Sequence, residues 1–521
     1  MQGHKDILVG IDAGTSVIKA VAFTAQGEQL AVASLPNITL SPVPNASEQD
    51  MKRTWQDCAT VLRHLGEMIP ALNQRILALA VTAQGDGTWL IDRDGEPVGH
   101  GWLWLDSRAA SIAVAALEQP TYPAHYARTG SGINACMQSM QLLWMKHHRP
   151  DMLARASTAM HCKDYLYFRL TGTRAVDPSE TNYTFGSYQT RMVQDDLVTA
   201  LGLGDCRHLL PPIVDGTREA GTLSADAARA TGLPQGLPVV LGYLDVVCSA
   251  LGAGLYDPTG TVGVSILGST GMHMRFTPHA KDVVLNDSRS GYTMVFPVPD
   301  AVSQMQSNMA ATLNIDWLLE IARQAGAMAG VVVERSILLA GLDEHVLTAN
   351  PGSALYHPYI VDAGERGPFL NPDARAQFTG LSTSTTYAGM MRGVFEGLAF
   401  AARDCYTTMG AIPGEVRVAG GAARSQAIRT ILASVLGARI RSVTRQETGA
   451  AGAVMMAAVN LGLYPDMAAC TRAWITPSLG PVTEPDPCLQ AFYEKLFPVY
   501  LDMRKTMTRS WGDMAALRAC F

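Results

Sequence analysis

Short apolar runs separated by polar turns open the chain. Residues 7–12 and 17–23 flank the turn at 13–16, which predicts a β-hairpin. A third run at 30–34 extends this hairpin into a meander. The first secondary structure is therefore expected to be a small antiparallel sheet.

Helical and strand-like patterns then alternate. Apolar residues recur at helical spacing over 55–69, a run of strand length follows at 76–82, and a short one at 89–91 precedes the turn at 92–95. Alternation of this kind is typical of the α/β class.

The opening pattern returns in the middle of the chain. Residues 261–267 and 272–276 are strand-like runs on either side of the turn Gly268-Ser-Thr-Gly271. A separation of about 250 residues suits one domain design used twice rather than a solenoid period. We therefore predict two lobes, residues 1–250 and 251–521, whose polar turns face one ligand across a central cleft.

Composition narrows the class of protein. The 521 residues are 48% hydrophobic and 17% charged, with a net charge of −6, and show no clustered Lys or Arg. We therefore expect neither a nucleic acid nor a membrane as partner. Nine cysteines without a C-x-x-C pair, and a first strand that starts too early for a signal peptide, favour the cytoplasm.

The first turn carries phosphate-binding chemistry. Asp12 ends the first strand, Gly14, Thr15 and Ser16 offer backbone amides and hydroxyls, and Lys19 follows. A phosphate with a divalent cation would use such groups, although an ordinary hairpin turn explains the tetrapeptide alone equally well. No Walker motif and no G-x-G-x-x-G is present.

Two further segments suggest ligand contacts. The strand-like run at 416–420 enters a turn with Gly420, Gly421 and Ser425, where a nucleoside could rest, although such glycines are often packing devices. Asp245 stands inside an apolar run, where an unpaired charge is costly to bury. A functional role or a partner would compensate for that cost. The alternative is that Asp245 is an ordinary exposed residue at a strand end or a helix cap.

Polar side chains also follow buried strands nearer the N-terminus. Gln84, Asp86 and Asp106 offer acceptors suited to hydroxyl groups, and each taken singly is also compatible with a surface turn. They are the candidate substrate-binding residues, together with Asp245.

Several segments in the second half carry a more specific pattern. Residues 356–381 contain Tyr-His-Pro-Tyr, Gly-Glu-Arg-Gly-Pro, Asn-Pro-Asp-Ala-Arg and Phe-Thr-Gly-Leu in this order, and residues 396–400, 420–425 and 449–453 follow. Together with Asp12-Ala-Gly-Thr15 and Lys19, these segments resemble the FGGY family of carbohydrate kinases over nearly the whole chain.

The resemblance implies an α/β fold of the actin/hexokinase (ribonuclease H-like) type, with ATP, Mg²⁺ and a small polyol or sugar in the cleft. By position, Asp245 matches the catalytic base and Asp12 the metal-associated carboxylate, with Asp245 close to the same ion. The nucleotide-binding residues expected from the two phosphate turns and the adenosine turn are Gly14, Thr15, Ser16, Lys19, Ser269, Thr270, Gly420, Gly421 and Ser425.

The expected substrate follows from the loop after Gln84. Glycerol kinases have Arg-Glu there and xylulokinases Met-His, whereas this chain has Gly85-Asp86, which predicts room for about one carbon more than glycerol. Residues 82–89 and 161–164 are most similar to those of the erythritol kinases in this family. We expect phosphorylation of a terminal hydroxyl of erythritol.

Other functions remain open at this point. A pentulose such as xylulose or ribulose is the alternative substrate, and a non-catalytic sugar sensor or an actin-like ATPase is the alternative class. A homodimer is one arrangement that the residue pattern leaves open.

Overall fold

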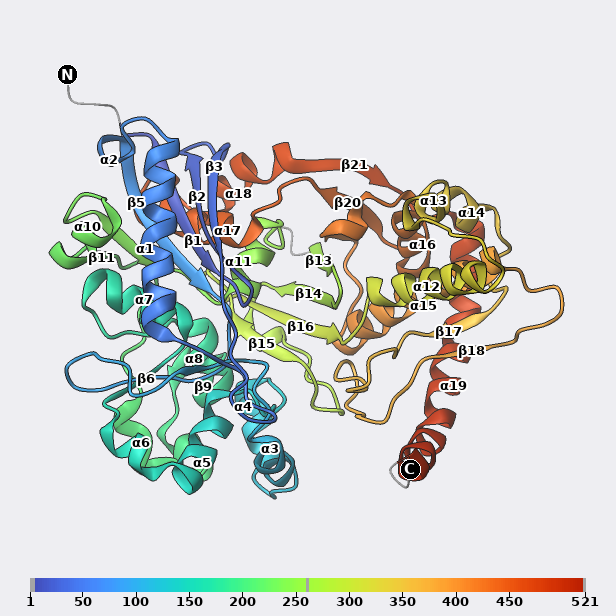
Figure 1. Cartoon of the computed structure of the whole chain (residues 1–521), viewed down its shortest axis with the longest axis horizontal. Coiled ribbons are helices and arrows are strands. Elements are labelled where there is room, and N and C mark those ends of the chain that lie inside the picture. The colour runs from blue at the N-terminus through green and yellow to red at the C-terminus, as the bar shows by residue number, and fades with distance from the viewer. Residues whose placement is uncertain (1–4, 259–261, 519–521) are drawn as a thin grey trace.

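The computed structural model describes residues 5–258 and 262–518, which form two α/β lobes (Figure 1). The first sheet, in spatial order, comprises β11 (Gly221–Thr222), β12 (Pro238–Leu241), β5 (Ile76–Ala83), β1 (Ile7–Ala13), β2 (Val17–Thr24) and β3 (Gln29–Pro36). The second comprises β15 (Tyr292–Val295), β16 (Val302–Asn308), β14 (Gly271–Thr277), β13 (Val262–Leu267), β19 (Glu415–Ala419), β20 (Arg439–Val443) and β21 (Leu479–Thr483).

The two sheets repeat one topology. In the first, β1, β2 and β3 form an antiparallel meander, β5 and β12 are added in parallel beside β1, and β11 closes the edge antiparallel to β12. In the second, β13, β14 and β16 form the meander, β19 and β20 follow in parallel, and β21 closes the edge. The expected reuse of one domain design is confirmed at the level of strand order.

The predicted elements form where the apolar pattern placed them. The first hairpin pairs Asp12 with Lys19, and the predicted helix is α1 (Met51–Met68). It begins four residues earlier than expected because the Asp50 carboxylate caps it, accepting hydrogen bonds from the N–H groups of Lys52 and Arg53. Thr261, predicted to begin the repeated hairpin, lies outside the described residues, and β13 is described from Val262.

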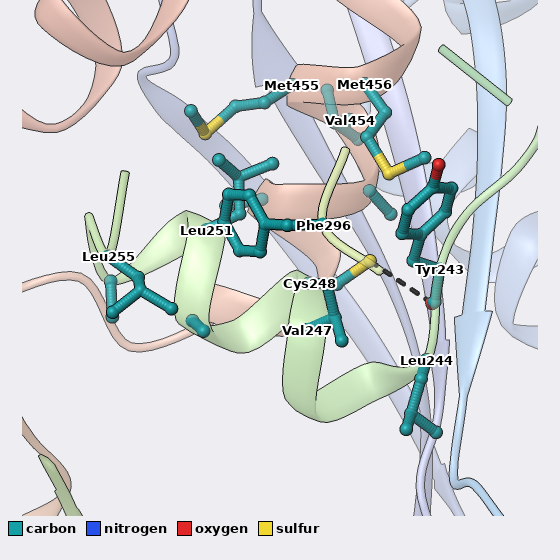
Figure 2. Packing of buried hydrophobic residues seen from close by; sticks show 14 of the residues in the cluster. Tyr243, Leu244, Val247, Cys248, Leu251, Leu255, Phe296, Val454, Met455 and Met456 are labelled. Atoms are coloured by element: carbon teal, nitrogen blue, oxygen red, sulfur yellow. Dashed lines mark hydrogen bonds between the residues drawn. The ribbon is translucent and has the colours of Figure 1, made fainter. Parts of the chain in front are cut away.

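Two helices join the lobes. α11 (Asp245–Gly252) lies against α17 (Thr448–Asn460), and α17, although late in the sequence, packs on β1 and β5 of the first sheet. Figure 2 shows their side chains in one apolar cluster that includes Val247, Cys248 and Val454. A Cβ at Gly452 would lie 1.9 Å from the Cys248 carbonyl oxygen, so only glycine permits this approach.

The remaining helices cover the sheets and build the lobe ends. They are α2 (Leu72–Arg75), α3 (Ala110–Leu117), α4 (Tyr122–Thr129), α5 (Gln138–His148), α6 (Pro150–Arg155), α7 (Cys162–Thr171), α8 (Pro178–Phe185), α9 (Asp195–Ala200), α10 (Ala225–Thr231), α12 (Thr312–Met328), α13 (Arg335–Leu339), α14 (Leu342–Thr348), α15 (Tyr387–Thr408), α16 (Gln426–Leu436), α18 (Met467–Trp474) and α19 (Pro487–Arg518).

Short strands complete the description: β4 (Glu48–Gln49), β6 (Trp89–Ile91), β7 (Gly101–Trp102), β8 (Thr158–Met160), β9 (Gly186–Ser187), β10 (Met192–Val193), β17 (Leu355–His357) and β18 (Gln377–Thr379). Among the described residues, no helix combines the length and apolar character that crossing a membrane requires. The eight cysteines in this part of the chain are all free.

Candidate active site

Two partly buried carboxylates lie at the junction of the lobes. Asp12 is near the end of β1, and burial raises its pKa to about 6, with Lys19 opposing the shift and Glu447 adding to it. A Cβ at position 449 would come within 2.4 Å of Asp12 Oδ2, so Gly449 leaves room for this carboxylate at the start of α17. Lys19 Nζ itself lies 2.8 Å from Glu447 Oε2.

Asp245 is the first residue of α11. Burial raises its pKa well above the ordinary value, and the negative charge of Asp12 raises it further. A carboxyl group with a raised pKa is a better proton acceptor near neutral pH than an ordinary aspartate. Because the charge of Asp12 acts on Asp245, a cation near both carboxylates would lower the electrostatic energy.

A cavity of about 240 Å³ opens beside Asp245. It brings together five of the predicted residues, namely Thr15, Gln84, Asp86, Asp245 and Thr270. Its other lining residues are Gly85, Trp104, Cys136, Tyr183, Leu244, Val246, Met272, Tyr292, Met294, Met305, Ser307 and Arg366. Loops and helices of the first lobe and strands of the second sheet therefore enclose one space.

Asp86 presents its carboxylate to this cavity from a loop held in an unusual conformation. Its φ of 53° is in the left-handed region. Oδ1 accepts a hydrogen bond from the Tyr183 hydroxyl at 2.9 Å, and Oδ2 from the Tyr292 hydroxyl at 3.3 Å and the Cys136 thiol at 3.4 Å. Burial raises the pKa of Asp86, while these three donors lower it.

Gln84 and Thr15 belong to one hydrogen-bond network. The Thr15 hydroxyl donates to Gln84 Oε1 at 2.8 Å and accepts from Trp104 Nε1 at 2.8 Å. Gln84 Nε2 in turn donates to Gln49 Oε1 at 2.7 Å. The predicted phosphate turn and the predicted sugar loop are therefore directly linked.

Asp106 is outside the cavity lining. Its Oδ2 accepts from the Ser47 N–H at 2.9 Å and from Arg108 Nη2 at 2.6 Å, while Oδ1 accepts from the Arg108 N–H and Nε. The guanidinium of Arg108 stacks over Trp102, 3.4 Å from the ring centroid. Asp106 therefore holds the Ser47 backbone and the Arg108 side chain in place. It does so two residues after Trp104, which does line the cavity.

Leu244 packs against one side of Gly85. A Cβ at position 85 would lie 1.9 Å from Cδ1 of Leu244, and both residues line the cavity. The expectation that Gly85 leaves room for an additional carbon stays a prediction.

The predicted adenosine turn lies between β19 and α16. Gly420 has a φ of 91°, and a Cβ there would meet the Leu267 carbonyl oxygen at 2.6 Å, whereas Gly421 faces open space. The Ser425 hydroxyl caps α16, accepting from the Ile428 N–H at 3.1 Å and donating to Asp343 at 2.6 Å. A second, mostly apolar pocket near this turn is lined by Leu267, Ala310, Ala311, Thr312, Ala422 and Ile428 among others.

The remaining predicted residues lie on the two turns. Gly14 and Ser16 follow β1, and the Ser269 carbonyl accepts from the Ala311 N–H at 2.7 Å. Tyr183, Tyr292 and Arg366, which also line the cavity, were missed. Arg366 lies within the Gly-Glu-Arg segment that signalled the family resemblance, whereas no local pattern distinguished the two tyrosines.

Solved structures share this architecture over almost the whole chain. A xylulose kinase from Rhodospirillum rubrum matches with a TM-score of 0.86 and 26% identity, covering 97% of this chain and 100% of its own. A gluconate kinase from Lactobacillus acidophilus matches with a TM-score of 0.87 and 22% identity, covering 98% and 99%. The fold is that of the two-lobed sugar kinases.

Sequence comparison defines the family. The model of the N-terminal domain of the FGGY family of carbohydrate kinases matches residues 7–252, and that of the C-terminal domain matches residues 263–461. An erythritol kinase from Brucella abortus (strain 2308) is 47% identical over 516 residues, which are 99% of each chain. The chain belongs to the FGGY family of carbohydrate kinases and is a phosphotransferase with ATP as co-substrate.

Proposed function

We propose that this kinase transfers the γ-phosphoryl group of ATP to a terminal hydroxyl of erythritol. The observation that carries the proposal is the 47% identity over 99% of both chains with the erythritol kinase from Brucella abortus. An L-xylulose/3-keto-L-gulonate kinase from Escherichia coli is 28% identical over 89% of this chain, which makes a pentulose the second candidate substrate. A cavity of about 240 Å³ with a few polar side chains in an otherwise apolar wall suits either kind of small polyhydroxylated molecule.

Asp245 is the proposed general base. It lines the cavity and begins α11, and its raised pKa suits the removal of a proton from the attacking hydroxyl. Phosphoryl transfer otherwise depends on positioning and on neutralising charge, so no covalent intermediate is needed.

Asp86 and Gln84 are the proposed polyol-binding residues. Asp86 Oδ1 keeps capacity to accept from a substrate hydroxyl beside the bond from Tyr183, whereas Oδ2 already accepts from Tyr292 and Cys136. An analogue that leaves these acceptors unpaired loses binding energy, which gives the site selectivity. Asp106 contributes on this proposal by holding Arg108 rather than by touching the polyol.

The nucleotide is proposed to lie across the two polar turns. Gly14, Thr15, Ser16 and Lys19 of the first turn and Ser269 and Thr270 of the second would hold its phosphates, with Gly420, Gly421 and Ser425 at the adenosine end. The apolar pocket beside this turn has a cavity volume of only about 20 Å³, so a base would have to rest against its mouth or the side chains there would have to move. Lys19 would then exchange its partner Glu447 for phosphate.

Asp12 and Asp245 fit a magnesium ion. Both are partly buried carboxylates, and the negative charge of Asp12 raises the pKa of Asp245, so a hard divalent cation would offset their repulsion. When bound, Mg²⁺ neutralises the charge of the phosphate groups.

As part of the same proposal, the lobes divide between residues 250 and 251. The protein is proposed to act in the cytoplasm, where free cysteines persist. The homodimer stays a prediction.

The direct test is product identification. The protein is incubated with ATP, Mg²⁺ and erythritol, and the products are examined by mass spectrometry and ³¹P NMR. A phosphomonoester of erythritol together with ADP is expected. A parallel reaction contains xylulose in place of erythritol. If xylulose phosphate forms there and no phosphorylated tetritol forms with erythritol, the proposed substrate is contradicted.

A further inference from the structure

Five charged or ionisable side chains are fully buried behind the Asp86 loop. They are His161, Lys163, Asp164, Asp177 and Glu180, here named the buried ion cluster, and each is at most 2% exposed. Lys163 is its centre, because Nζ lies 2.8 Å from Asp177 Oδ1 and 3.2 Å from Asp164 Oδ1 and also contacts Glu180 Oε2. Charges at this depth are tolerated only when they are paired and hydrogen-bonded.

The ammonium group of Lys163 takes the place that a metal ion would take. Ligand-type atoms of His161, Asp164 and Glu180 lie within 4.8 Å of one another, and Lys163 contacts both carboxylates of this set. A covalently tethered cation therefore already offsets part of the negative charge of the three carboxylates. Unlike a metal ion, it cannot dissociate from the protein.

One arm of the cluster reaches the substrate loop. Glu180 Oε1 accepts a hydrogen bond from the Asp86 N–H at 2.5 Å, while its Oε2 faces Lys163. Asp86 has a φ of 53°, in the left-handed region, which aspartate adopts more readily than most residues but which remains uncommon. The bond to Glu180 holds the backbone in this conformation from the protein interior.

The other arm reaches the residue before the proposed base. Asp177 Oδ2 accepts from the Ser179 hydroxyl, and Ser179 Oγ accepts from the Leu244 N–H at 3.0 Å. Leu244 directly precedes Asp245 at the start of α11. Asp177 and Glu180 stand at the N-cap and in the first turn of α8, so both arms start from one short segment.

We propose that Lys163 is a positioning residue that sets the relative placement of Asp86 and Asp245, because its ammonium group holds Glu180 and Asp177 at once. One cation thereby connects the group that binds the polyol with the group that accepts its proton. The inference rests on the proposed roles of Asp86 and Asp245, and it adds a determinant of substrate geometry that touches neither substrate nor nucleotide.

The two arms predict different kinetic signatures. Ser179→Ala removes the acceptor for the Leu244 N–H, so kcat should fall about tenfold while KM for erythritol changes less than about twofold. Glu180→Gln places an amide between two donors, Asp86 N–H and Lys163 Nζ, so one donor must lose its acceptor in either orientation. Its KM for erythritol should rise about tenfold with a smaller change in kcat.

Lys163→Met should both lower kcat and raise KM for erythritol, and it should leave KM for ATP unchanged. Thr181→Val is the matched control, because Thr181 is buried on the same helix and its hydroxyl has no hydrogen-bond partner among the described residues. It should keep wild-type kcat and KM. Circular dichroism and the thermal midpoint of every variant show whether it is folded.

The outcomes separate this inference from the proposed function. Wild-type kinetics in folded Ser179→Ala or folded Glu180→Gln would overturn the positioning role. The positioning role would also be overturned if the two variants changed kcat and both KM values equally. If Lys163→Met does not fold, Ser179→Ala and Glu180→Gln still test the positioning role. Failure of the wild-type protein to phosphorylate erythritol overturns only the substrate assignment, and the same kinetic split is then measured with the sugar that it does phosphorylate.

Discussion

The Tyr292 hydroxyl lies 3.3 Å from Oδ2 of Asp86, which joins a strand of the second sheet to the substrate loop of the first lobe. The Tyr292 ring also meets Tyr183 edge to face, with ring centroids 5.2 Å apart. Asn134 Nδ2 donates to the same Tyr292 hydroxyl at 3.0 Å. Residues of both lobes therefore form this side of the cavity wall, and the hydrogen bond between Tyr292 and Asp86 joins them.

Tyr292→Phe should raise KM for erythritol about tenfold or more, since hydrogen bonds to charged groups contribute about 1.5–3 kcal/mol. KM for ATP should not change. Steady-state kinetics with either substrate varied measures both values. Tyr464→Phe is the control, because its hydroxyl bonds to the Ala25 carbonyl outside the cavity. Equal KM values for erythritol in wild type and Tyr292→Phe would remove Tyr292 from the site.

Asp245→Asn should lower kcat by at least about 100-fold, the lower range for loss of an acid–base group. The same change should raise the thermal midpoint, because burial opposes the charged form of Asp245 and the amide is neutral. Kinetics and a thermal melt on one preparation test both effects. Turnover close to wild type would mean that another group accepts the proton.

Asp12→Asn should increase the Mg²⁺ concentration required for half-maximal activity by at least about tenfold, because an amide is a weaker ligand than a carboxylate. The measurement is a magnesium titration at saturating erythritol. Asp513→Asn, an exposed aspartate on the last helix, is the comparison. An unchanged magnesium requirement in Asp12→Asn would place the ion elsewhere.

Glu365 should make stability depend on pH. Burial raises its pKa from 4.5 to about 7, although Oε1 accepts from the N–H groups of Met309 and Arg366. The folded state therefore binds more protons than the unfolded state between these values, and stability falls as pH rises through this window.

Glu365→Gln imitates the protonated acid and removes this contribution. Between pH 5 and pH 8, the free energy of unfolding of the wild type should fall by about 3 kcal/mol relative to the variant. Urea denaturation at several pH values measures it. A constant difference between the two proteins over this range would show that Glu365 keeps an ordinary pKa in the fold.

The fold was predictable because its signals are local. Alternation of apolar runs and helical spacing located β1, β2, α1 and β5, and the repeated hairpin anticipated the matching strand order of the two sheets. The helix boundary at Asp50 was missed because a side-chain cap, rather than apolar spacing, determines where α1 begins.

The site was predictable only in part, because much of it depends on contacts between distant segments. Asp86 and Tyr292 are 206 positions apart, so no spacing rule connects them. Leu244 packs against Gly85, and Arg108 binds the oxygens of Asp106, so side-chain packing decides what each residue can reach. The charge of Asp245 inside an apolar run was the local signal that did identify a cavity residue.

The most direct test of the account is a coupled ADP-release assay with erythritol, glycerol, threitol, the pentitols, ribulose and xylulose. Each is measured at saturating ATP and Mg²⁺, and kcat/KM values are compared. Erythritol is predicted to have the highest value. A higher kcat/KM for a five-carbon ketose than for erythritol would contradict the assignment of erythritol as the substrate.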